Sequence, residues 1–378
     1  MITVNGKFAN ADVYVSGYEN LDSATYGQIV QLLSVPCMEG CKIAVMADCH
    51  AGVGCCVGYT QTVTDKIVPN LVGVDIACGM LVCKISGDYD FDYARLDKLI
   101  RQNIPCGMAH RKTLHKFAKN VDLSGLVADV DQDKLLYSVG SLGGGNHFIE
   151  VDKDDEGNRY IVIHSGSRHL GDATCRFHQN RAIQRYLDNR AETGDDTQYP
   201  SNLAWLEGSL TDDYLNDMNI CASFSYWNRK AMLDVILDGM DIKRRYILDE
   251  FTTLHNYVDV ENRIIRKGAI SLQDGERAII PMNMRDGSLI VTGKGCAEAN
   301  FSGPHGAGRV LSRGAAKQSL SMEEFKKSME GIYTTSVRQS TIDESPMAYK
   351  PMDKILDNIG ELCTVDTIIK PEYNFKAS

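Results

Sequence analysis

The sequence lacks the features that mark membrane and secreted proteins. No window contains the roughly 18 to 20 uninterrupted apolar residues that a membrane-spanning helix requires. The first residues, Met1 to Lys7, contain no charged segment followed by an apolar core, so we expect no secretory signal. The sequence therefore predicts a soluble, cytoplasmic protein.

The chain also lacks paired cysteines of the zinc-ribbon kind. None of its 12 cysteines forms a C-x-x-C pair, which argues against a structural zinc ribbon. Because disulfides are rare in reducing compartments, these residues are expected to be reduced thiols. Any metal site would have to combine cysteine with other ligands.

An excess of positive charge is absent as well. The formal net charge is −10, which argues against nonspecific coating of nucleic acid. Acidic residues concentrate in three segments, Asp129–Asp133, Asp152–Glu156 and Asp212–Asp217. Arginines instead lie near the glycine- and histidine-rich motifs, at Arg168, Arg285, Arg309 and Arg313. A polyanion would therefore have to be held at one local site.

No low-complexity linker or internal repeat divides the 378 residues, of which 43% are hydrophobic. We predict one α+β domain spanning residues 1–378. Val4–Val15 is predicted to form a small strand or a hairpin around Asn5-Gly6. Alternating or apolar runs predict strands at Lys42–Ala47, Val57–Val63, Leu71–Val74, Met80–Ile85, Tyr160–His164, Ile264–Ile270, Arg277–Met282, Leu289–Val291 and Val365–Ile369. Helices are predicted at Tyr93–Gln102, in a long region interrupted near Gly194–Pro200 that resumes from Thr211 to about Leu237, and from the Ser302–Arg309 motif through Lys317.

The stretch from Leu71 to Gly79 organises the rest of the chain. A short apolar run, Leu71–Val74, is followed by Asp75 and Cys78, and Gly79 marks a turn. A carboxylate and a thiol three residues apart at a strand end could form half of a metal site. The alternative is that Cys78 is a small buried hydrophobe and Asp75 a turn former. This stretch alone leaves both open.

Three histidines strengthen the metal hypothesis. His147, His164 and His255 each follow an apolar or helical segment, which for His255 is predicted to be a helix, and adjoin small or amide residues. Any one of them alone is more often structural. Together with Asp75 and Cys78 they offer nitrogen, oxygen and thiolate donors, a set that suits Mn, Fe or Zn better than Mg or Ca. Because a thiolate can bridge, five donors favour a two-metal centre.

His305 lies in a different setting, between Pro304 and the Gly306-Ala307-Gly308 turn. Arg309 is predicted to lie just inside the following helix, whose N-terminus would favour phosphate. An imidazole there could attack phosphorus as a nucleophile. The alternative is an ordinary histidine in a turn. The segment Gly287–Gly295 resembles a phosphate-binding P-loop but lacks its spacing and its Ser or Thr after lysine.

Five motifs occur in the order found in the RtcB family of RNA ligases, which this chain resembles from about Lys42 to Lys376. The motifs are Val74-Asp75-Ile-Ala-Cys78-Gly79, Gly143-Gly-Gly-Asn146-His147-Phe148, His164-Ser-Gly-Ser-Arg168, His255-Asn256-Tyr257 and His305-Gly-Ala-Gly-Arg309. The resemblance implies the RtcB-type α+β fold, with mixed sheets, surrounding helices and a two-metal active-site cleft. It also implies GTP- and Mn²⁺-dependent joining of RNA ends carrying a 2′,3′-cyclic phosphate or 3′-phosphate to 5′-hydroxyl ends, in tRNA splicing or RNA repair.

The resemblance also implies a function for each site residue. Cys78 would be shared by two Mn²⁺ ions, with Asp75 and His147 completing one shell and His164 and His255 the other. His305 would become covalently guanylylated. GTP contacts would come from Asn146, Glu150, Asn256 and Lys376, and RNA phosphate contacts from Arg168 and Arg309. An archease-type activating protein is a further expected partner.

The segment Pro281–Ser288 departs from the family pattern, which is rich in Gly and Ser there. We expect Arg285 to contact the GTP triphosphate, oriented by Asp286. The alternative is a plain turn in which Asp286 and Gly287 reverse the chain. Two other functions remain open: a metal-dependent phosphoesterase that opens cyclic phosphates without ligation, and a noncatalytic RNA-end binding protein. A covalent GMP adduct would distinguish the ligase from both.

Overall fold

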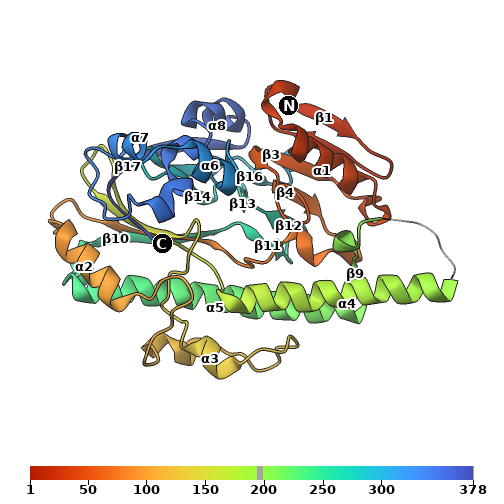
Figure 1. Cartoon of the computed structure of the whole chain (residues 1–378), viewed down its shortest axis with the longest axis horizontal. Helices are drawn as coiled ribbons and strands as arrows, with labels where there is room; N and C mark the ends of the chain where they lie inside the picture. Colours follow the sequence, from red (N-terminus) through yellow and green to blue (C-terminus); the bar gives the residue numbers. More distant parts are fainter. Residues whose placement is uncertain (194–198, 378) are drawn as a thin grey trace.

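The computed structural model describes residues 1–193 and 199–377, and its largest sheet has seven strands that all pair antiparallel (Figure 1). Their order is β10 (Ile247–Leu254), β6 (Gly79–Ile85), β8 (Arg159–Ser165), β7 (Phe148–Lys153), β17 (Cys363–Lys376), β15 (Gly287–Gly293) and β14 (Arg277–Asn283). Because side chains alternate along a strand, one face of this sheet carries His164, Phe148 and Lys376 together.

A second sheet has six strands, of which only β2 and β3 pair in parallel. Their order is β1 (Ile2–Asn5), β2 (Asn10–Val13), β3 (Ile43–His50), β4 (Val57–Thr62), β12 (Ile264–Lys267) and β11 (Asn256–Asp259). Two small sheets pair β13 (Ala269–Ser271) with β16 (Ser302–Pro304) and β5 (Lys66–Ile67) with β9 (Leu206–Glu207). The chain crosses from the first sheet to the second at His255, which separates β10 from β11.

Two long helices, α4 and α5, run side by side across the lower part of the molecule in Figure 1. The α-helices of the described residues are α1 (Ser23–Leu33), α2 (Tyr93–Asn103), α3 (Gln132–Leu136), α4 (His169–Thr193), α5 (Ser209–Gly239), α6 (Arg313–Ser319), α7 (Met322–Ser328) and α8 (Met352–Ile359). Met232, Leu233 and Ile236 of α5 pack with Leu81 and Ile163 of the seven-stranded sheet. The helix therefore covers one face of that sheet and leaves the opposite face for the site.

The α+β prediction is confirmed, and most predicted strands and helices are present within a few residues. The single domain over residues 1–378 stays a prediction. The predicted helix interruption near Gly194–Pro200 falls mainly on residues 194–198, which lie outside the described part of the chain. Among the described residues, no helix combines the length and apolarity needed to cross a membrane.

Four local predictions are wrong. Leu71–Val74 is not a strand: a 3₁₀ turn over Pro69–Leu71 ends at Leu71, and Gly73 has φ +92°. The single strand predicted over Ile264–Ile270 is divided at Gly268, where φ is +60°. Residues before His255 form strand β10, not a helix. The helix predicted to begin near Arg309 begins only at Arg313, capped by Ser312.

Candidate active site

Two groups of potential metal ligands meet at Cys78. One contains Cys78, His164 and His255, the other Asp75, Cys78 and His147, and within each group the ligand atoms lie within 4.8 Å of one another. The Cys78 Sγ lies 3.4 Å from His147 Nε2 and 3.2 Å from His164 Nε2. The Asp75 Oδ2 lies 3.1 Å from His147 Nε2. All five ligands predicted from the sequence are therefore brought together.

Backbone hydrogen bonds fix the segment that carries Asp75 and Cys78. The Cys78 amide donates to the Asp75 carbonyl at 3.1 Å, and Ala77 between them has φ +56°. The Cys78 carbonyl accepts from the His255 amide at 3.0 Å, while the Ala77 amide donates to the Asn256 carbonyl at 2.7 Å. The turn at the start of β6 and the junction between β10 and β11 therefore hold each other in register.

Helix α5 holds the same region from behind. The Arg229 guanidinium, which is fully buried, donates through Nη1 to the carbonyls of Ala77 at 3.2 Å and Ser165 at 2.8 Å. Asn228 donates to the Gly166 carbonyl at 3.1 Å. These bonds tie the Asp75–Cys78 turn to the end of β8, where His164 lies. Side chains outside the ligand set thus orient the ligands, as is common around metal sites.

The electrostatic environment of the cluster suits a cation. Burial, together with neighbouring imidazoles, lowers the pKa of His164 and His255 well below the ordinary value, so both are neutral at pH 7. Burial and the Asp75 carboxylate raise the pKa of the Cys78 thiol, so a bound cation is needed to hold it as a thiolate. The Nδ1 atoms of His164 and His255 are buried and have no hydrogen-bond partner among the described residues. This donor set fits a divalent transition metal.

A cavity of about 790 Å³ adjoins the cluster. Its lining includes His164 of the cluster together with His50, Met80, Asn146, Phe148, Glu150, Met282, Asn283, His305, Arg309, Arg313, Tyr349 and Lys376. The rings of His255 and His305 lie 4.9 Å apart between centroids, and those of His164 and His255 lie 5.2 Å apart. A continuous row of imidazoles therefore connects the ligand cluster to His305.

His305 is held by Asp48, a residue to which the sequence patterns assign no function. The Asp48 Oδ2 lies 2.6 Å from His305 Nδ1 and also accepts from the His305 amide at 3.0 Å. Asp48 is fully buried at the end of β3, far from His305 in sequence. Because a carboxylate accepts, Nδ1 is assigned as the protonated nitrogen, which leaves the lone pair on Nε2. The only sequence signal was a polar residue ending an apolar strand.

The prediction that His305 precedes a helix N-terminus is wrong. His305 follows β16 directly, and α6 begins eight residues later at Arg313. Gly308, with φ +72°, packs so closely that an added Cβ would lie 2.1 Å from the Asp48 carbonyl oxygen. Contact with β3, not a helix dipole, therefore positions the imidazole.

The predicted nucleotide contacts divide into two groups. Asn146, Glu150 and Lys376 line the cavity. Burial raises the pKa of Glu150 to about 7, although the Lys376 charge opposes this shift. Asn256 has a different position: its Nδ2 donates to the Asp75 carbonyl at 3.1 Å and its Oδ1 accepts from the Gly268 amide at 2.8 Å. Asn256 therefore supports the metal-ligand turn from outside the cavity lining.

The predicted arginines are also placed differently from one another. Arg168 lies beside the cluster, with Nη1 3.4 Å from His147 Nδ1 and Nη2 donating to the Gly107 carbonyl at 2.9 Å. Arg309 lines the cavity but pairs with Glu344 at 3.3 Å. Arg285 lines a separate pocket and pairs with Asp286 at 2.7 Å.

The structure adds a cation that received no individual function in the sequence analysis. Arg313 lines the cavity and pairs with Glu344 at 2.7 Å and with Asp343 at 3.0 Å. Lys376 pairs with the same Glu344 at 2.6 Å. Burial would raise the pKa of Glu344, but Lys376 and Arg313 outweigh it and lower the value to about 2. One buried carboxylate therefore pairs with three cations that line the cavity.

Fold and site together define an α+β protein with two histidine- and cysteine-containing ligand groups beside a cavity of about 790 Å³, an arrangement that fits a metal-dependent enzyme. The family model described as "tRNA-splicing ligase RtcB" matches residues 28–133 and 120–377. The chain belongs to the RtcB family, and the resemblance seen in its motifs is confirmed.

Curated relatives agree with this assignment. The chain is similar to the RNA-splicing ligase RtcB of Escherichia coli, with 32% identity over 362 residues that cover 85% of this chain and 87% of the relative. It is also similar to the tRNA-splicing ligase RtcB of Methanococcus maripaludis, with 24% identity and coverage of 92% and 88%. For the tRNA-splicing ligase RtcB of Archaeoglobus fulgidus the identity is 26%, with coverage of 87% and 86%.

Proposed function

We propose that this RtcB family protein is an RNA ligase that uses GTP and Mn²⁺ to join a 2′,3′-cyclic phosphate or 3′-phosphate end to a 5′-hydroxyl end. The observation that carries the proposal is the meeting of two ligand groups at Cys78, beside a cavity that contains His305. The relatives, which are RNA-splicing and tRNA-splicing ligases, support the same class of reaction.

In this proposal Cys78 is shared by two Mn²⁺ ions. Asp75 and His147 would complete one set of protein ligands, and His164 and His255 the other. The neutral imidazoles of His164 and His255 support these assignments, as does a thiol that needs a cation to ionise. When bound, the metals would offset phosphate charge and supply the hydroxide that opens a cyclic phosphate.

His305 is the proposed nucleophile. Its Nδ1–H donates to Asp48, which orients the ring and directs the Nε2 lone pair to the reaction. Attack of Nε2 on the α-phosphorus of GTP forms the N–P bond, and the bond from that phosphorus to the β-phosphate oxygen breaks, so pyrophosphate leaves. Asp48 holds the proton on Nδ1 and stabilises the positive charge that develops on the ring.

Two further transfers complete the reaction. An oxygen of the RNA 3′-phosphate attacks the phosphorus of the adduct, and the N–P bond to His305 breaks. The 5′-hydroxyl then attacks the activated 3′-phosphate, forms the phosphodiester and releases GMP. The cavity that encloses the two RNA ends would exclude water and align them.

The remaining assignments belong to the same proposal. Asn146, Glu150 and Lys376 would contact GTP, since they line the cavity near His305. Asn256 would act indirectly by holding the Asp75 turn. Arg168 and Arg309 would contact RNA phosphate, and Arg285 stays an untested GTP contact. The archease-type partner, the cytoplasmic location and the single domain likewise stay predictions.

Incubation with labelled GTP and Mn²⁺ tests the proposal. We expect an acid-labile protein–GMP bond, followed by joining of a 3′-phosphate RNA to a 5′-hydroxyl RNA. A protein that opens cyclic phosphates without forming the adduct would be a phosphoesterase. A protein that binds RNA ends and does neither would be a noncatalytic binder.

A further inference from the structure

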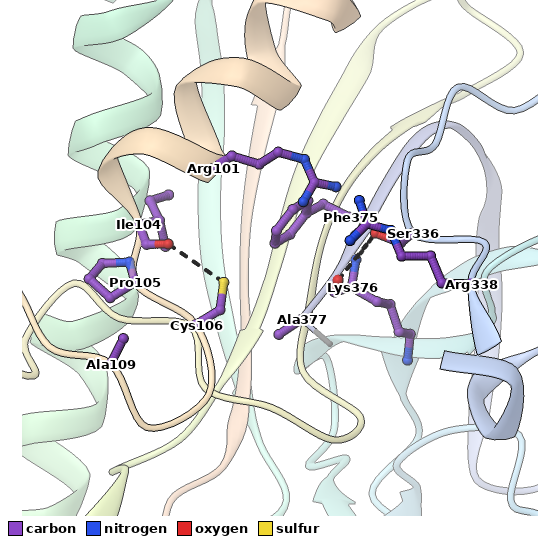
Figure 2. Close-up of a pocket in the computed structure, with 10 residues that line it drawn as sticks. All are labelled: Arg101, Ile104, Pro105, Cys106, Ala109, Ser336, Arg338, Phe375, Lys376 and Ala377. Carbon is purple, nitrogen blue, oxygen red and sulfur yellow. Dashed lines mark hydrogen bonds between the residues drawn. The ribbon is translucent and has the colours of Figure 1, made fainter. Parts of the chain in front are cut away.

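A second, smaller pocket of about 290 Å³ lies beside the C-terminal strand (Figure 2). It is lined by Arg101, Ile104, Pro105, Cys106, Ala109, Ser336, Arg338, Phe375, Lys376 and Ala377. In Figure 2 the Arg101 side chain extends from helix α2 toward Phe375, and Arg338 lies on the opposite wall. Two guanidinium groups therefore face one concave space.

The two arginines are held in different ways. Arg101 is fixed by Asp97, whose Oδ2 lies 2.8 Å from its Nε, and by stacking 4.9 Å above the Phe375 ring. Arg338 is exposed and donates through Nε to the Thr335 carbonyl at 2.9 Å. No carboxylate of the described residues lies within ion-pair distance of Arg338. Its charge is therefore available to an anion.

This pocket adjoins the active site at one shared residue. Lys376 lines both the small pocket and the large cavity. Behind Cys106, the Gly107 amide donates to the Gly143 carbonyl at 2.9 Å, and the Gly107 carbonyl accepts from Arg168. The wall of the small pocket thus continues into the glycine loop that precedes His147. A polymer entering the large cavity could extend to this second site.

We propose that the small pocket binds a backbone phosphate of the RNA strand whose end occupies the large cavity. This inference rests on the proposed ligase function. A phosphodiester offers oxygens to two guanidinium groups at once, and arginine is the side chain best suited to such contacts. The nearness to the active site, at the shared Lys376, favours RNA over an acidic protein. Because the chain as a whole carries excess negative charge, an unpaired arginine here marks a local binding site.

The test compares Arg338→Ala with Arg245→Ala, a matched control that removes an exposed arginine outside the pocket lining. Binding of two 3′-phosphate RNAs, a dinucleotide and a ten-nucleotide strand, is measured with Mn²⁺ and without GTP. We expect Arg338→Ala to lower the binding affinity for the longer RNA about fivefold and to leave the affinity for the dinucleotide unchanged. The slope of log affinity against log salt should fall by about 0.7 for the longer RNA.

Several outcomes would overturn the inference. If Arg338→Ala and Arg245→Ala lower RNA affinity equally, the effect is one of general charge. If Arg338→Ala lowers the affinity for both RNA lengths equally, Arg338 contacts the terminal phosphate. A polyglutamate peptide that binds as tightly as RNA and shows the same loss would identify a protein-docking surface instead. Formation of the GMP adduct is measured in parallel. If the unmodified protein forms no adduct, the proposed ligase function is rejected. If the adduct forms and Arg338→Ala leaves RNA affinity unchanged, only the phosphate site in this pocket is rejected.

Discussion

The floor of the active site and its rim are both polar, yet they differ in what they offer a ligand. On the floor, the Nδ1 atoms of His164 and His255 are buried and have no hydrogen-bond partner among the residues that the structure describes. On the rim, Lys376, Arg309 and Arg313 are all paired with Glu344. The floor therefore offers unpartnered nitrogens, whereas the rim offers cations that are already paired with a carboxylate.

This difference separates two kinds of preorganisation. Buried unpaired donors are costly in a folded protein, so a cluster of them indicates a ligand that completes it. Burying cations that are already paired costs less free energy, but a phosphate must compete with Glu344 to bind them. We infer that metal binding on the floor requires little rearrangement, whereas phosphate binding on the rim requires exchange of ion-pair partners.

The largest expected effect comes from the residue that joins the two regions. His305→Ala should abolish the GMP adduct completely while leaving metal content unchanged, because His305 belongs to neither ligand group. Adduct formation is measured with labelled GTP and metal content by elemental analysis. His110→Ala removes an exposed histidine and provides the control. An adduct that persists in His305→Ala would assign the nucleophile to another residue.

The floor itself is tested at the shared ligand. Cys78→Ser should reduce bound Mn²⁺ and joining activity together, because a hydroxyl rarely ionises and replaces a bridging thiolate poorly. Asp75→Ala should weaken one metal more than the other, since it belongs to one ligand group only. Titration with Mn²⁺, followed by elemental analysis, gives both stoichiometries. Full occupancy in both variants would contradict the shared thiolate.

The rim is tested at its common carboxylate. Glu344→Gln should lower the free energy of unfolding by about 3 kcal/mol at pH 7, because three cations lose their buried partner. The folded-state pKa of Glu344 is lowered from 4.5 to about 2, so this stabilisation is present above pH 4.5 and is lost as the pH falls toward 2. Urea unfolding should therefore show the difference between the two proteins shrinking below about pH 4.5. A constant difference would refute the ion-pair account.

The smallest effect is expected outside both regions. Arg285 pairs with Asp286 and lines a separate pocket, so Arg285→Ala should change the GTP concentration needed for half-maximal adduct formation by less than about twofold. If Arg285 makes the triphosphate contact expected from the sequence, the variant requires a larger increase in this GTP concentration. Adduct formation over a range of GTP concentrations decides between them, with joining of a pre-activated RNA as the control step.

Sequence patterns were most informative where chemistry depends on residue type. The combination of Asp75, Cys78 and three histidines indicates a borderline metal whatever the fold, and the structure brings all five together. Patterns were less informative where local conformation depends on distant contacts. Gly306 and Gly308 resemble the start of a helix, but packing of Gly308 against Asp48 keeps the chain irregular until Ser312.

Asp48 and Arg229 illustrate the remaining limit. Asp48 is far from His305 along the chain, and no spacing rule connects them, yet strand β3 carries its carboxylate to the imidazole. Arg229 lies on a long helix whose apolar residues indicate only core packing. Its guanidinium nevertheless holds the carbonyls of Ala77 and Ser165. Both functions arise between elements that the sequence places far apart.

The sequence by itself determined the family, the α+β class and the set of candidate metal ligands, because these depend on residue identity and order. Only the tertiary structure decided which donors are free and which are already paired. Lys376 and Arg309 look equally available in the sequence, but Glu344 lies within ion-pair distance of both. The reason is physical: availability depends on burial and on neighbours in space, and long-range packing alone sets both.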